Sequence, residues 1–437
     1  MNRSILRLAV PNIVSNITVP LLGFIDLAIV GHLDSASYIG GIVVATTIFN
    51  FIYWNFSFLR MGTSGFTAQS YGAEDVSEQA NILLRSLLVA LVGGLMLILL
   101  QPLILRLGFY FFDAGDNVRQ YASEYFRVYI WAAPAVLGMY TFNGWFVGMQ
   151  DAKTPMFISI SINIVNILLS LFFVFVLHLS IKGVALATLC AQYTGVLLAL
   201  WIWLRKYKYM RKNIRFSILK NMRAYVPFFK VNANIFIRTL ALVFVTTFFV
   251  SASSREGEDT LNVNALIMQF FTIFSYLMDG FAYAAEALTG KFVGAKSKEP
   301  LGRLIKYLFG WGLGVVVLFT MAYALFFEQI LSLITDKQSV IALAMDYKLW
   351  ALLIPIAGFS AFLWDGIFVG ATASRQMRNS MIGAAVTFFA IYLGCRYFAP
   401  GVFSQYANNV LWFAFISYLA IRGFAQTLMA KSVIRNS

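Results

Sequence analysis

Eight ionisable side chains interrupt long apolar runs of this sequence and are the first candidates for chemistry. They are Asp26, Arg60, Lys230, Arg238, Asp279, Glu286, Asp365 and Arg422. If these runs cross a membrane, a charge near the centre costs at least about 2.5–3.5 kcal/mol, so each residue should face the protein interior and serve a purpose. A carboxyl group enclosed by apolar atoms can also exchange a proton at ordinary pH.

Asp26 is the strongest of these candidates. It lies in the stretch LLGFIDLAIVGHL at 21–33, among leucine, isoleucine, valine and phenylalanine. Pro11 and Pro20 lie in the same run, where they remove backbone hydrogen bonds and allow a helix to kink or straighten. The alternative is that Asp26 caps a helix or snorkels near the membrane surface, within about two turns of the polar residues that follow.

A second set of charges lies in the last half of the chain. Asp279 and Glu286 are seven residues apart, which is two helical turns, so both should lie on one inward face. Arg238 could neutralise one of them, which leaves a structural ion pair and a substrate or proton site as alternatives. Asp365 precedes GIFVG and could be either a carboxylate that lines a cavity or a polar residue in helix packing.

The elements that position these residues follow from composition. Of 437 residues, 60% are hydrophobic and 12% are charged, which no ordinary soluble domain sustains. Stretches without Asp, Glu, Lys or Arg cover 35–59, 86–105, 128–150, 154–181, 183–204, 260–278, 307–327 and 397–421. Shorter or once-interrupted runs cover 8–31, 225–251, 343–372 and 379–396. The sequence therefore predicts an all-α polytopic membrane protein with twelve transmembrane helices.

The net charge of +14 is concentrated between the two halves. Residues 205–223 contain eight Lys or Arg and no acid, and the positive-inside rule then places this loop and both termini in the cytoplasm. We interpret the loop as an anchor on the anionic lipid of the cell membrane, not as a nucleic-acid site. It would link an N-terminal bundle (1–204) to a C-terminal bundle (224–437).

Two pairs of motifs indicate that these halves are repeats. NGWFVG at 143–148 matches DGIFVG at 365–370, and TAQSYGA at 67–73 matches TGKFVGA at 289–295. Both pairs have the same separation along the chain, which we call the repeat spacing. Six helices per half give both repeats the same orientation, related by a pseudo-two-fold axis along the membrane normal. Two such bundles around a central cavity are typical of carriers that work by alternating access.

Other functional classes are weakly supported. Cys190 and Cys395 lie in separate apolar runs, so neither a disulfide framework nor a metal cluster is indicated. An enzyme would need a nucleophile and base or a metal constellation, and no HExxH or GxSxG with suitable partners is present. A flippase of lipid-linked saccharides would need many cationic side chains in its cavity to bind a pyrophosphate. The candidate cations here are mainly Arg60, Lys230 and Arg238, and four candidate carboxylates accompany them.

The order of several motifs resembles a known family. They are VPNIVSN at 10–16, DLAIVGHL at 26–33, FLRMGTSGFTAQSYGA at 58–73, NGWFVGMQDAKTP at 143–155, YLMDGFAYAAEALTGKFVGA at 276–295 and WDGIFVGAT at 364–372. With them the chain resembles the multidrug and toxic compound extrusion (MATE) transporters over nearly its full length, and within these the branch named after DNA-damage-inducible protein F. The resemblance implies a monomer without cofactor that exports organic, often cationic, compounds, driven by protons or sodium ions.

The resemblance also implies roles for individual residues. Asp26 matches the aspartate that binds the coupling ion, and Pro11 matches a proline that lets its helix bend, with Pro20 in the same helix. Supporting polar groups correspond to Asn143, Asn166 and Thr188, and the C-terminal polar set would be Arg238, Asp279, Glu286 and Asp365. Ser170 takes the place of a second aspartate found in some members. Because a sodium site prefers charged oxygen ligands, we expect proton coupling, with sodium coupling as the alternative.

Overall fold

The computed structural model describes residues 1–31, 36–111, 115–213 and 222–436, and within these ranges the regular elements are all helices. The first half contains α1 (Asn2–Gly31), α2 (Ala36–Asn55), α3 (Phe58–Gly72), α4 (Val76–Leu99), α5 (Gln101–Phe111), α6 (Asp116–Tyr129), η1 (Ile130–Ala132), α7 (Ala133–Gly148), α8 (Lys153–Leu171), η2 (Phe172–Val176), α9 (Ser180–Lys206) and η3 (Lys208–Asn213). The second half contains α10 (Met222–Arg255), α11 (Glu258–Gly294), α12 (Lys298–Ile334), α13 (Gln338–Met345), α14 (Lys348–Gly370), α15 (Ser374–Phe398) and α16 (Pro400–Asn436).

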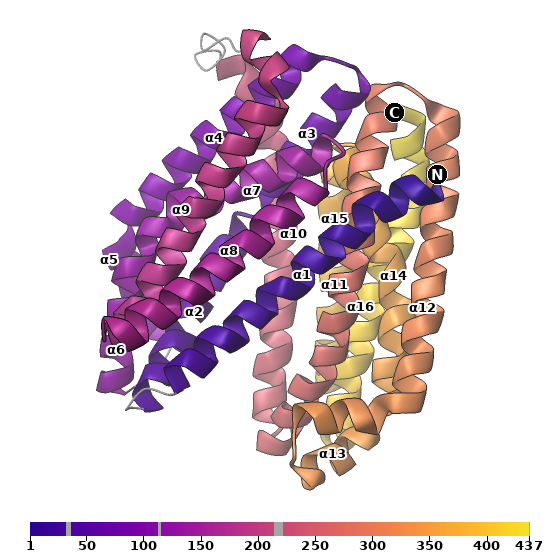
Figure 1. The fold of residues 1–437 in the computed structure, drawn as a ribbon. Helices are drawn as coiled ribbons and strands as arrows, with labels where there is room; N and C mark the ends of the chain where they lie inside the picture. Colours follow the sequence, from indigo (N-terminus) through magenta and orange to yellow (C-terminus); the bar gives the residue numbers. More distant parts are fainter. Residues whose placement is uncertain (32–35, 112–114, 214–221, 437) are drawn as a thin grey trace. The chain divides into compact units, whose positions relative to one another are not determined.

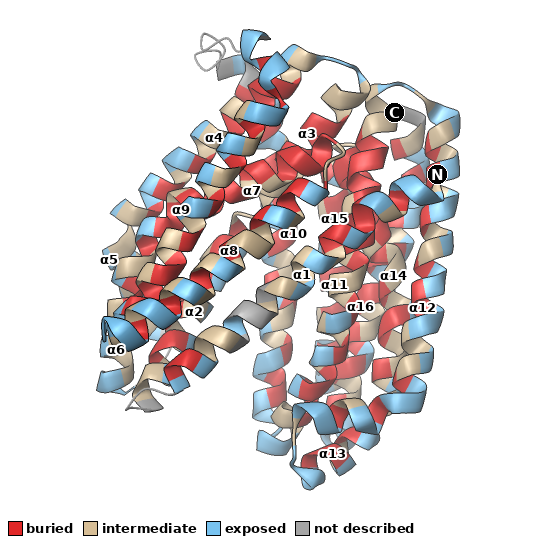
Figure 2. Ribbon diagram, viewed as in Figure 1, coloured by how far each residue is buried: buried red, intermediate tan, exposed pale blue. Residues whose placement is uncertain are grey.

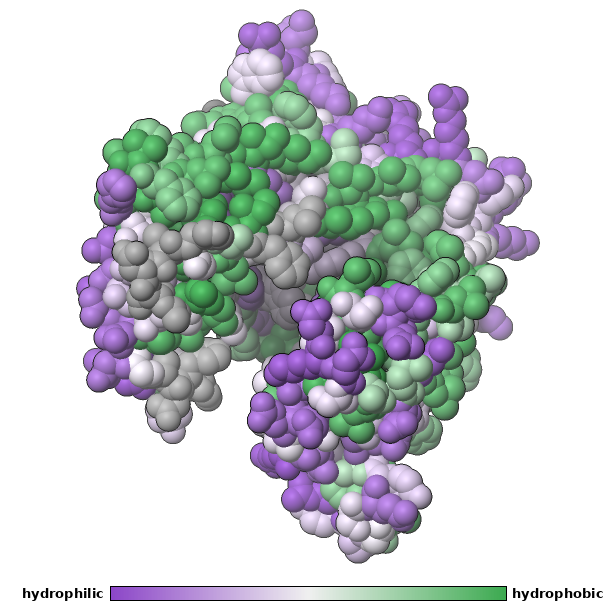
Figure 3. Space-filling model, turned by 60° about the horizontal axis from the view of Figure 1, so that its bottom comes forward, coloured by the Kyte–Doolittle hydropathy of each residue, from purple (hydrophilic) through white to green (hydrophobic). Residues whose placement is uncertain are grey.

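The expected all-α membrane fold is confirmed. In the described part of the chain, ten helical stretches are long and apolar enough to cross a membrane. Together with α1 and the α6–α7 stretch they make the twelve segments that hydropathy predicts. Many apolar side chains on these helices point outward, as lipid contact requires, and on α12 they include Leu313, Val317, Leu318, Met321 and Leu325. Figure 3 shows broad hydrophobic areas, drawn in green, on the surface.

Three helix boundaries differ from the hydropathy pattern. The expected helix at 35–59 ends at Asn55, and α3 starts at Phe58 and continues the segment to Gly72. The expected helix at 128–150 is interrupted by a 3-10 turn at 130–132, two residues before Pro134, whose missing N–H suits the first turn of α7. The helix expected to run to 181 ends with the π-helical turn η2, and a turn follows. His178 there has a left-handed φ of 53°.

The described chain forms two compact units (Figure 1). The N-terminal unit is Val10–Phe229, where α3 and α4 pack on α7, α2 packs on α6, and α8 packs on α9. The C-terminal unit is Lys230–Ser437 with Met1–Ala9, where α14 packs between α11 and α16, and α15 packs on α16. In the predicted basic linker, α9 and η3 continue to Asn213, and residues 214–221 lie outside the described part.

Most helices bury one face and expose another, as Figure 2 shows, whereas α3 and α7 have no exposed residue. In the N-terminal unit a large apolar cluster joins α2, α6, α7 and α9, with Phe49, Phe126 and Leu137 almost fully buried. A second cluster joins α4, α7, α8 and α9 around Trp145. The indole of Trp145 donates a 2.8 Å hydrogen bond to the carbonyl oxygen of Gln79, which leaves its one polar atom satisfied.

The backbone repeats itself at the predicted repeat spacing. Glu74 and Lys296 have φ angles of 57° and 53°, and Gln150 and Thr372 have φ angles of 62° and 52°. A left-handed conformation is uncommon for residues other than glycine, so its recurrence at matched positions is informative. The same helix-ending turn is therefore built twice in each unit, after α3 and α7 and again after α11 and α14.

Helix packing repeats with the same spacing. A Cβ atom on Gly144 of α7 would overlap the carbonyl oxygen of Arg60, and one on Gly366 of α14 would overlap the carbonyl oxygen of Ala282. Arg60 and Ala282 are themselves one repeat spacing apart. Each glycine thus lets two helices approach to backbone contact, α7 on α3 and α14 on α11, which is typical of small residues at membrane helix interfaces. The internal repeat is a structural one.

Candidate functional site

Asp26 lies on α1, five residues before the helix ends at Gly31. Its side chain is half-buried, and one carboxyl oxygen, Oδ1, is buried without a hydrogen-bond partner among the described residues. The neighbours Ile25 and Leu27 pack against the apolar cluster of the N-terminal unit. A buried polar oxygen without a donor is costly and is usually found where a ligand, proton or water is bound.

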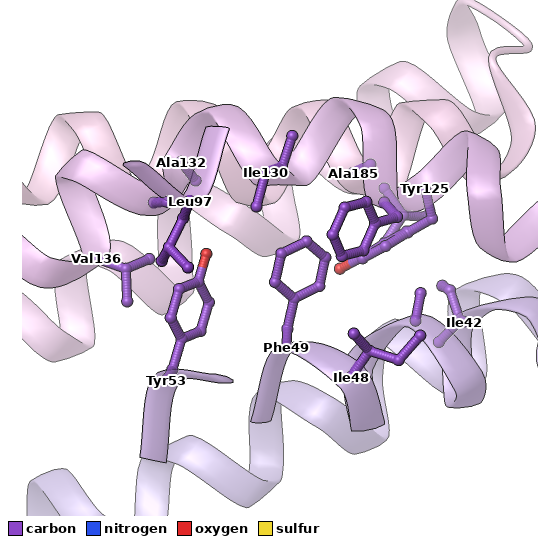
Figure 4. Packing of buried hydrophobic residues seen from close by; sticks show 14 of the residues in the cluster. Ile42, Ile48, Phe49, Tyr53, Leu97, Tyr125, Ile130, Ala132, Val136 and Ala185 are labelled. Atoms are coloured by element: carbon purple, nitrogen blue, oxygen red, sulfur yellow. The ribbon is translucent and has the colours of Figure 1, made fainter. Parts of the chain in front are cut away.

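Aromatic residues surround this part of the unit. Phe49 and Tyr53 of α2 lie opposite Tyr125 and Ile130, as Figure 4 shows. The ring of Tyr129 lies 4.6 Å from that of Phe49 and 5.7 Å from that of Tyr125, measured between centroids. Tyr125 and Tyr129 are both close enough to the Asp26 carboxyl group to interact with it electrostatically. These two tyrosines therefore belong to the candidate site.

Sequence reasoning missed Tyr125 and Tyr129. Both lie in α6, whose charged residues Asp116, Arg119, Glu124 and Arg127 leave Tyr125 outside the predicted run at 128–150 and Tyr129 at its edge. Their spacing of four residues places both on one helix face, and that spacing is the signal that could have indicated them. Only the packing of α6 against α2 shows that this face is turned inward.

Three of the predicted polar residues form one hydrogen-bonded network. The Nδ2 atom of Asn166 donates to Thr188 Oγ1 at 3.0 Å, and Ser170 Oγ donates to Asn166 Oδ1 at 3.2 Å. Thr188 in turn donates to the carbonyl oxygen of Val184 at 3.0 Å, and the Tyr125 hydroxyl is close enough to Thr188 to interact with it. Asn166 and Ser170 are completely buried, so α8 contributes the fixed part of the network.

Tyr125 is the residue that links this network to Asp26. It is close enough to interact both with Thr188 and with the Asp26 carboxyl group. Asp26, Tyr125, Thr188, Asn166 and Ser170 come from four helices, α1, α6, α9 and α8. The tertiary structure thus brings together residues that are far apart in the sequence, and a single carboxylate is the only formal charge in this group.

Asn143 does not enter this network through any hydrogen bond of the described residues. It lies on α7 beside Gly144, and its Oδ1 atom is buried without a hydrogen-bond partner there. The predicted bending residues Pro11 and Pro20 both lie inside α1, which runs through them as one helix. α8 holds α1 between these prolines, because Asn163 Nδ2 donates to the carbonyl oxygen of Thr18 at 3.1 Å.

In the C-terminal unit, Asp365 is the centre of a buried ion-pair cluster. Arg238 of α10 and Arg422 of α16 both donate from Nη2 to Asp365 Oδ2, and Gln426 Nε2 donates to Oδ1 at 2.5 Å. All four side chains are buried. The expectation that Arg238 neutralises Asp279 or Glu286 is therefore wrong, since its ion pair is with Asp365. The spacing rule applied to α11 alone could not show which helix faces Arg238.

Asp279 and Glu286 lie on α11, as expected. Glu286 is almost fully buried, and Asp279 is half-buried within electrostatic range of Arg422. Two arginines and two aspartates thus share this part of the unit, which balances their formal charges. His178 lies exposed in the turn before α9. The other histidine, His32, is outside the described residues.

Comparison with known proteins agrees with this arrangement. The MatE family model matches residues 11–172 and 235–394, so it covers both repeats. DNA damage-inducible protein F of Escherichia coli (strain K12) is 35% identical over 440 aligned residues, which cover all of this chain and 93% of that protein. The resemblance inferred from the motifs is thereby confirmed.

Solved structures show the same fold. The structure titled "Outward-facing conformation of a multidrug resistance MATE family transporter of the MOP superfamily" matches with a TM-score of 0.86, over 99% of this chain and 96% of that one. A second, "Crystal structure of MATE in the bent conformation", matches with a TM-score of 0.85 over 100% and 96%. Both are 20% identical in sequence, so the likeness concerns the fold.

Proposed function

Because the chain belongs to the MatE family, whose model spans both of its repeats, we propose that it exports organic, mainly cationic compounds in exchange for protons. The single observation that carries the proposal is the Asp26 carboxyl group, with one buried oxygen unpartnered among the described residues. A group in that situation can hold either a proton or the charge of a substrate, but not both. That exclusion is the physical basis for exchanging one against the other.

The coupling step takes place at Asp26. As a carboxylate it attracts an organic cation, because opposite charges interact strongly where water is scarce. When a proton enters from outside, the carboxyl group becomes neutral and the substrate cation loses its partner. The substrate then dissociates outward, and the protonated transporter changes to its inward-facing state by alternating access. Tyr125 and Tyr129 add aromatic faces that suit an organic cation beside this carboxyl group.

The neutral network on α8 and α9 supports protons over sodium as the coupling ion. Asn166, Ser170 and Thr188 offer amide and hydroxyl oxygens, and all four of their side-chain polar atoms already bond to one another or to the backbone. A hard cation such as Na⁺ favours several oxygens with negative charge among them. One carboxylate with neutral neighbours is enough for a proton, which needs a single basic oxygen.

Helix α1 carries the conformational response in this proposal. Pro11 and Pro20 each remove one backbone hydrogen bond from the helix, which lowers the cost of bending it. Asn143 supports the N-terminal bundle, and the C-terminal set of Arg238, Asp279, Glu286 and Asp365 supports the other, with Arg238 and Asp365 joined in an ion pair. We further propose a monomer in the cell membrane, with both termini in the cytoplasm and no cofactor or enzymatic step, as the distribution of basic residues favours.

Counterflow in proteoliposomes tests the proposal. Proteoliposomes that contain the purified protein are loaded with a fluorescent lipophilic cation. Efflux is then followed under an imposed pH gradient or, separately, an imposed sodium gradient. The proton gradient alone should drive transport in the wild type, and Asp26→Asn should abolish it. Asp116→Asn is a matched control, since it removes the same charge from an exposed position at the start of α6.

Two results would contradict the proposal. Full proton-driven efflux by Asp26→Asn would show that another group carries the proton. Transport with the sodium gradient alone would replace the proton by sodium as the coupling ion, while leaving export itself in place.

A further inference from the structure

The C-terminal unit contains a pocket of about 270 Å³ that transport by Asp26 does not use. It lies where the turn from α14 to α15 meets the beginning of α10 and the end of α16. Its wall contains polar and cationic side chains, Lys230, Asn234, Thr372, Ser374, Arg375 and Gln376, beside the apolar residues Val231, Ala371, Ala373 and Val433. No acidic residue is among the described residues that line it.

The cations of this pocket have no counter-ion in the described part of the chain. Lys230 and Arg375 are exposed, and neither takes part in an ion pair there. The wall between them is fixed, because buried Asn234 donates to Ser374 Oγ at 3.1 Å. Arg378 donates to Asn234 Oδ1 at 2.8 Å, which adds a third positive charge next to the pocket. An anion would find two free cations on a preformed wall.

The first backbone N–H groups of α15 also lie at this pocket. Residues 374–376 form its first turn and line the pocket, and no side chain caps the helix. The first N–H groups of a helix have no partner within it, and they carry the positive end of the helix dipole. Such a terminus favours an anion, most of all when lysine and arginine are beside it.

The other repeat shows what fills the equivalent position. Asp151 lies one repeat spacing before Ala373, and its Oδ1 accepts the backbone N–H of Thr154 in the first turn of α8 at 3.3 Å. Its Oδ2 accepts bonds from the Thr154 hydroxyl and from Lys206 Nζ, each at 2.6 Å. In the first repeat, the carboxylate of Asp151 is therefore the anion that binds the N-terminus of α8 and Lys206. In the second repeat the carboxylate is replaced by the methyl group of Ala373, and a pocket is present instead.

We propose that the pocket formed by Lys230, Asn234 and the first turn of α15 binds a phosphate-bearing anion, in the place that Asp151 fills in the first repeat. The ligand is either the headgroup of an anionic phospholipid or a soluble phosphate compound. With the termini in the cytoplasm, as proposed above, the pocket faces the cytoplasm at the level of the lipid headgroups. The site is separate from Asp26 and is independent of the coupling ion.

Thermal unfolding of the purified full-length protein in neutral detergent tests this proposal. Three additives are titrated at matched ionic strength: inorganic phosphate, short-chain phosphatidylglycerol and short-chain phosphatidylcholine. We expect phosphatidylglycerol or phosphate to raise the unfolding temperature, with phosphatidylcholine as the neutral comparison. A response to phosphate alone identifies a soluble ligand, and a response to phosphatidylglycerol without one to phosphate identifies a lipid.

Three variants locate the effect. Lys230→Gln with Arg375→Gln should weaken the anion response about tenfold or more, because it removes two charge-assisted contacts. Ala373→Asp should lose the response while remaining folded, since it supplies the carboxylate that the first repeat carries at this position. Lys153→Gln removes the exposed cation that matches Arg375 in the first repeat, and it should respond like the wild type.

An unchanged anion response in the double variant or in Ala373→Asp would overturn the proposal. So would a wild type that neither phosphate nor phosphatidylglycerol stabilises beyond phosphatidylcholine. None of these results depends on transport, so they are distinguishable from a failure of the proton-exchange function.

Discussion

Asp365 of α14 is paired with Arg238 of α10, at the two positions where the first repeat carries Asn143 and Asn16. The same pair of helices thus holds an ion pair in one repeat and two amides in the other. Arg422 and Gln426 complete the shell around Asp365. In the second repeat an ion pair joins the two helices, whereas the first repeat has neutral groups at the matching positions. This difference can be tested directly.

Asp365→Asn should destabilise the protein strongly. It leaves Arg238 and Arg422 buried with half of their counter-charge, and breaking a buried pair from one side costs about 3–5 kcal/mol. Adding Arg238→Asn reproduces the amide pair of the first repeat, so the double variant should lose less stability than the two single variants together. Denaturant unfolding in detergent measures both, and additive losses would argue against the pairing.

Gly144→Ala should destabilise the N-terminal unit, because the new methyl group would overlap the carbonyl oxygen of Arg60. Overpacking of this kind typically costs about 1–3 kcal/mol, and a backbone contact cannot relax by rotating a side chain. Gly366→Ala should behave in the same way against Ala282. Gly310→Ala on α12 is the matched control, since a Cβ there meets nothing within 4 Å. If Gly310→Ala lowered the unfolding temperature as much as Gly144→Ala and Gly366→Ala do, the result would contradict this packing.

Tyr125→Phe should keep the fold and reduce transport. The ring remains to pack in the aromatic cluster, but the hydroxyl that interacts with Thr188 and Asp26 is lost. Removing one partner from such a network typically costs about 1–3 kcal/mol, so we expect at least a severalfold lower efflux rate and a shifted pH profile. Tyr110→Phe, at an exposed position of α5, is the control. Equal pH profiles for both variants would remove Tyr125 from the site.

Ser170→Asp should give the transporter a response to sodium. It places a second carboxylate in contact with Asn166, in the neutral network near Asp26. Two carboxylates with neutral oxygens between them are the kind of ligand set that a hard cation favours. Sodium-dependent quenching of tryptophan fluorescence should appear in this variant and not in Ser170→Asn. If the wild type already binds sodium equally well, the absence of a second carboxylate does not decide the coupling ion.

The stability contributed by Asp151 should depend on pH in the acidic range. Burial raises the pKa of Asp151, but the bonds from Lys206 and Thr154 lower it by more, so the folded-state pKa lies below the ordinary value of 3.8. The group then stabilises the fold above about pH 4, and this contribution is lost as the pH falls through the folded-state pKa. Lys206 is half exposed, so the pair contributes about 1 kcal/mol or less.

Comparison of the wild type with Asp151→Asn measures this effect. The difference in unfolding free energy between them should be constant from pH 7 to about pH 5 and should shrink below about pH 4. A difference that grows towards acid pH would mean that the folded-state pKa is raised. Lys206→Gln should show the same trend, because it removes the main positive partner.

Much of this molecule follows from the sequence by itself. Long apolar runs determine twelve membrane-spanning segments, because a backbone in lipid must satisfy its own hydrogen bonds locally. Asp26 stands out for the same reason, as a charge where charges are costly. The repeat spacing is also readable from two pairs of short motifs. Glycines at 144 and 366 and left-handed turns at 150 and 372 then follow the repeat in the structure.

Only the tertiary structure decided which residues meet. Hydropathy and helical spacing are properties of one segment, whereas a contact depends on which faces of two helices are turned together. Arg238 therefore pairs with Asp365 and not with a carboxylate of α11, and Tyr125 of the charged helix α6 joins Thr188. The same holds for the pocket at α15. Only the fold shows that cationic side chains lie around Ala373, the position at which the first repeat has a carboxylate.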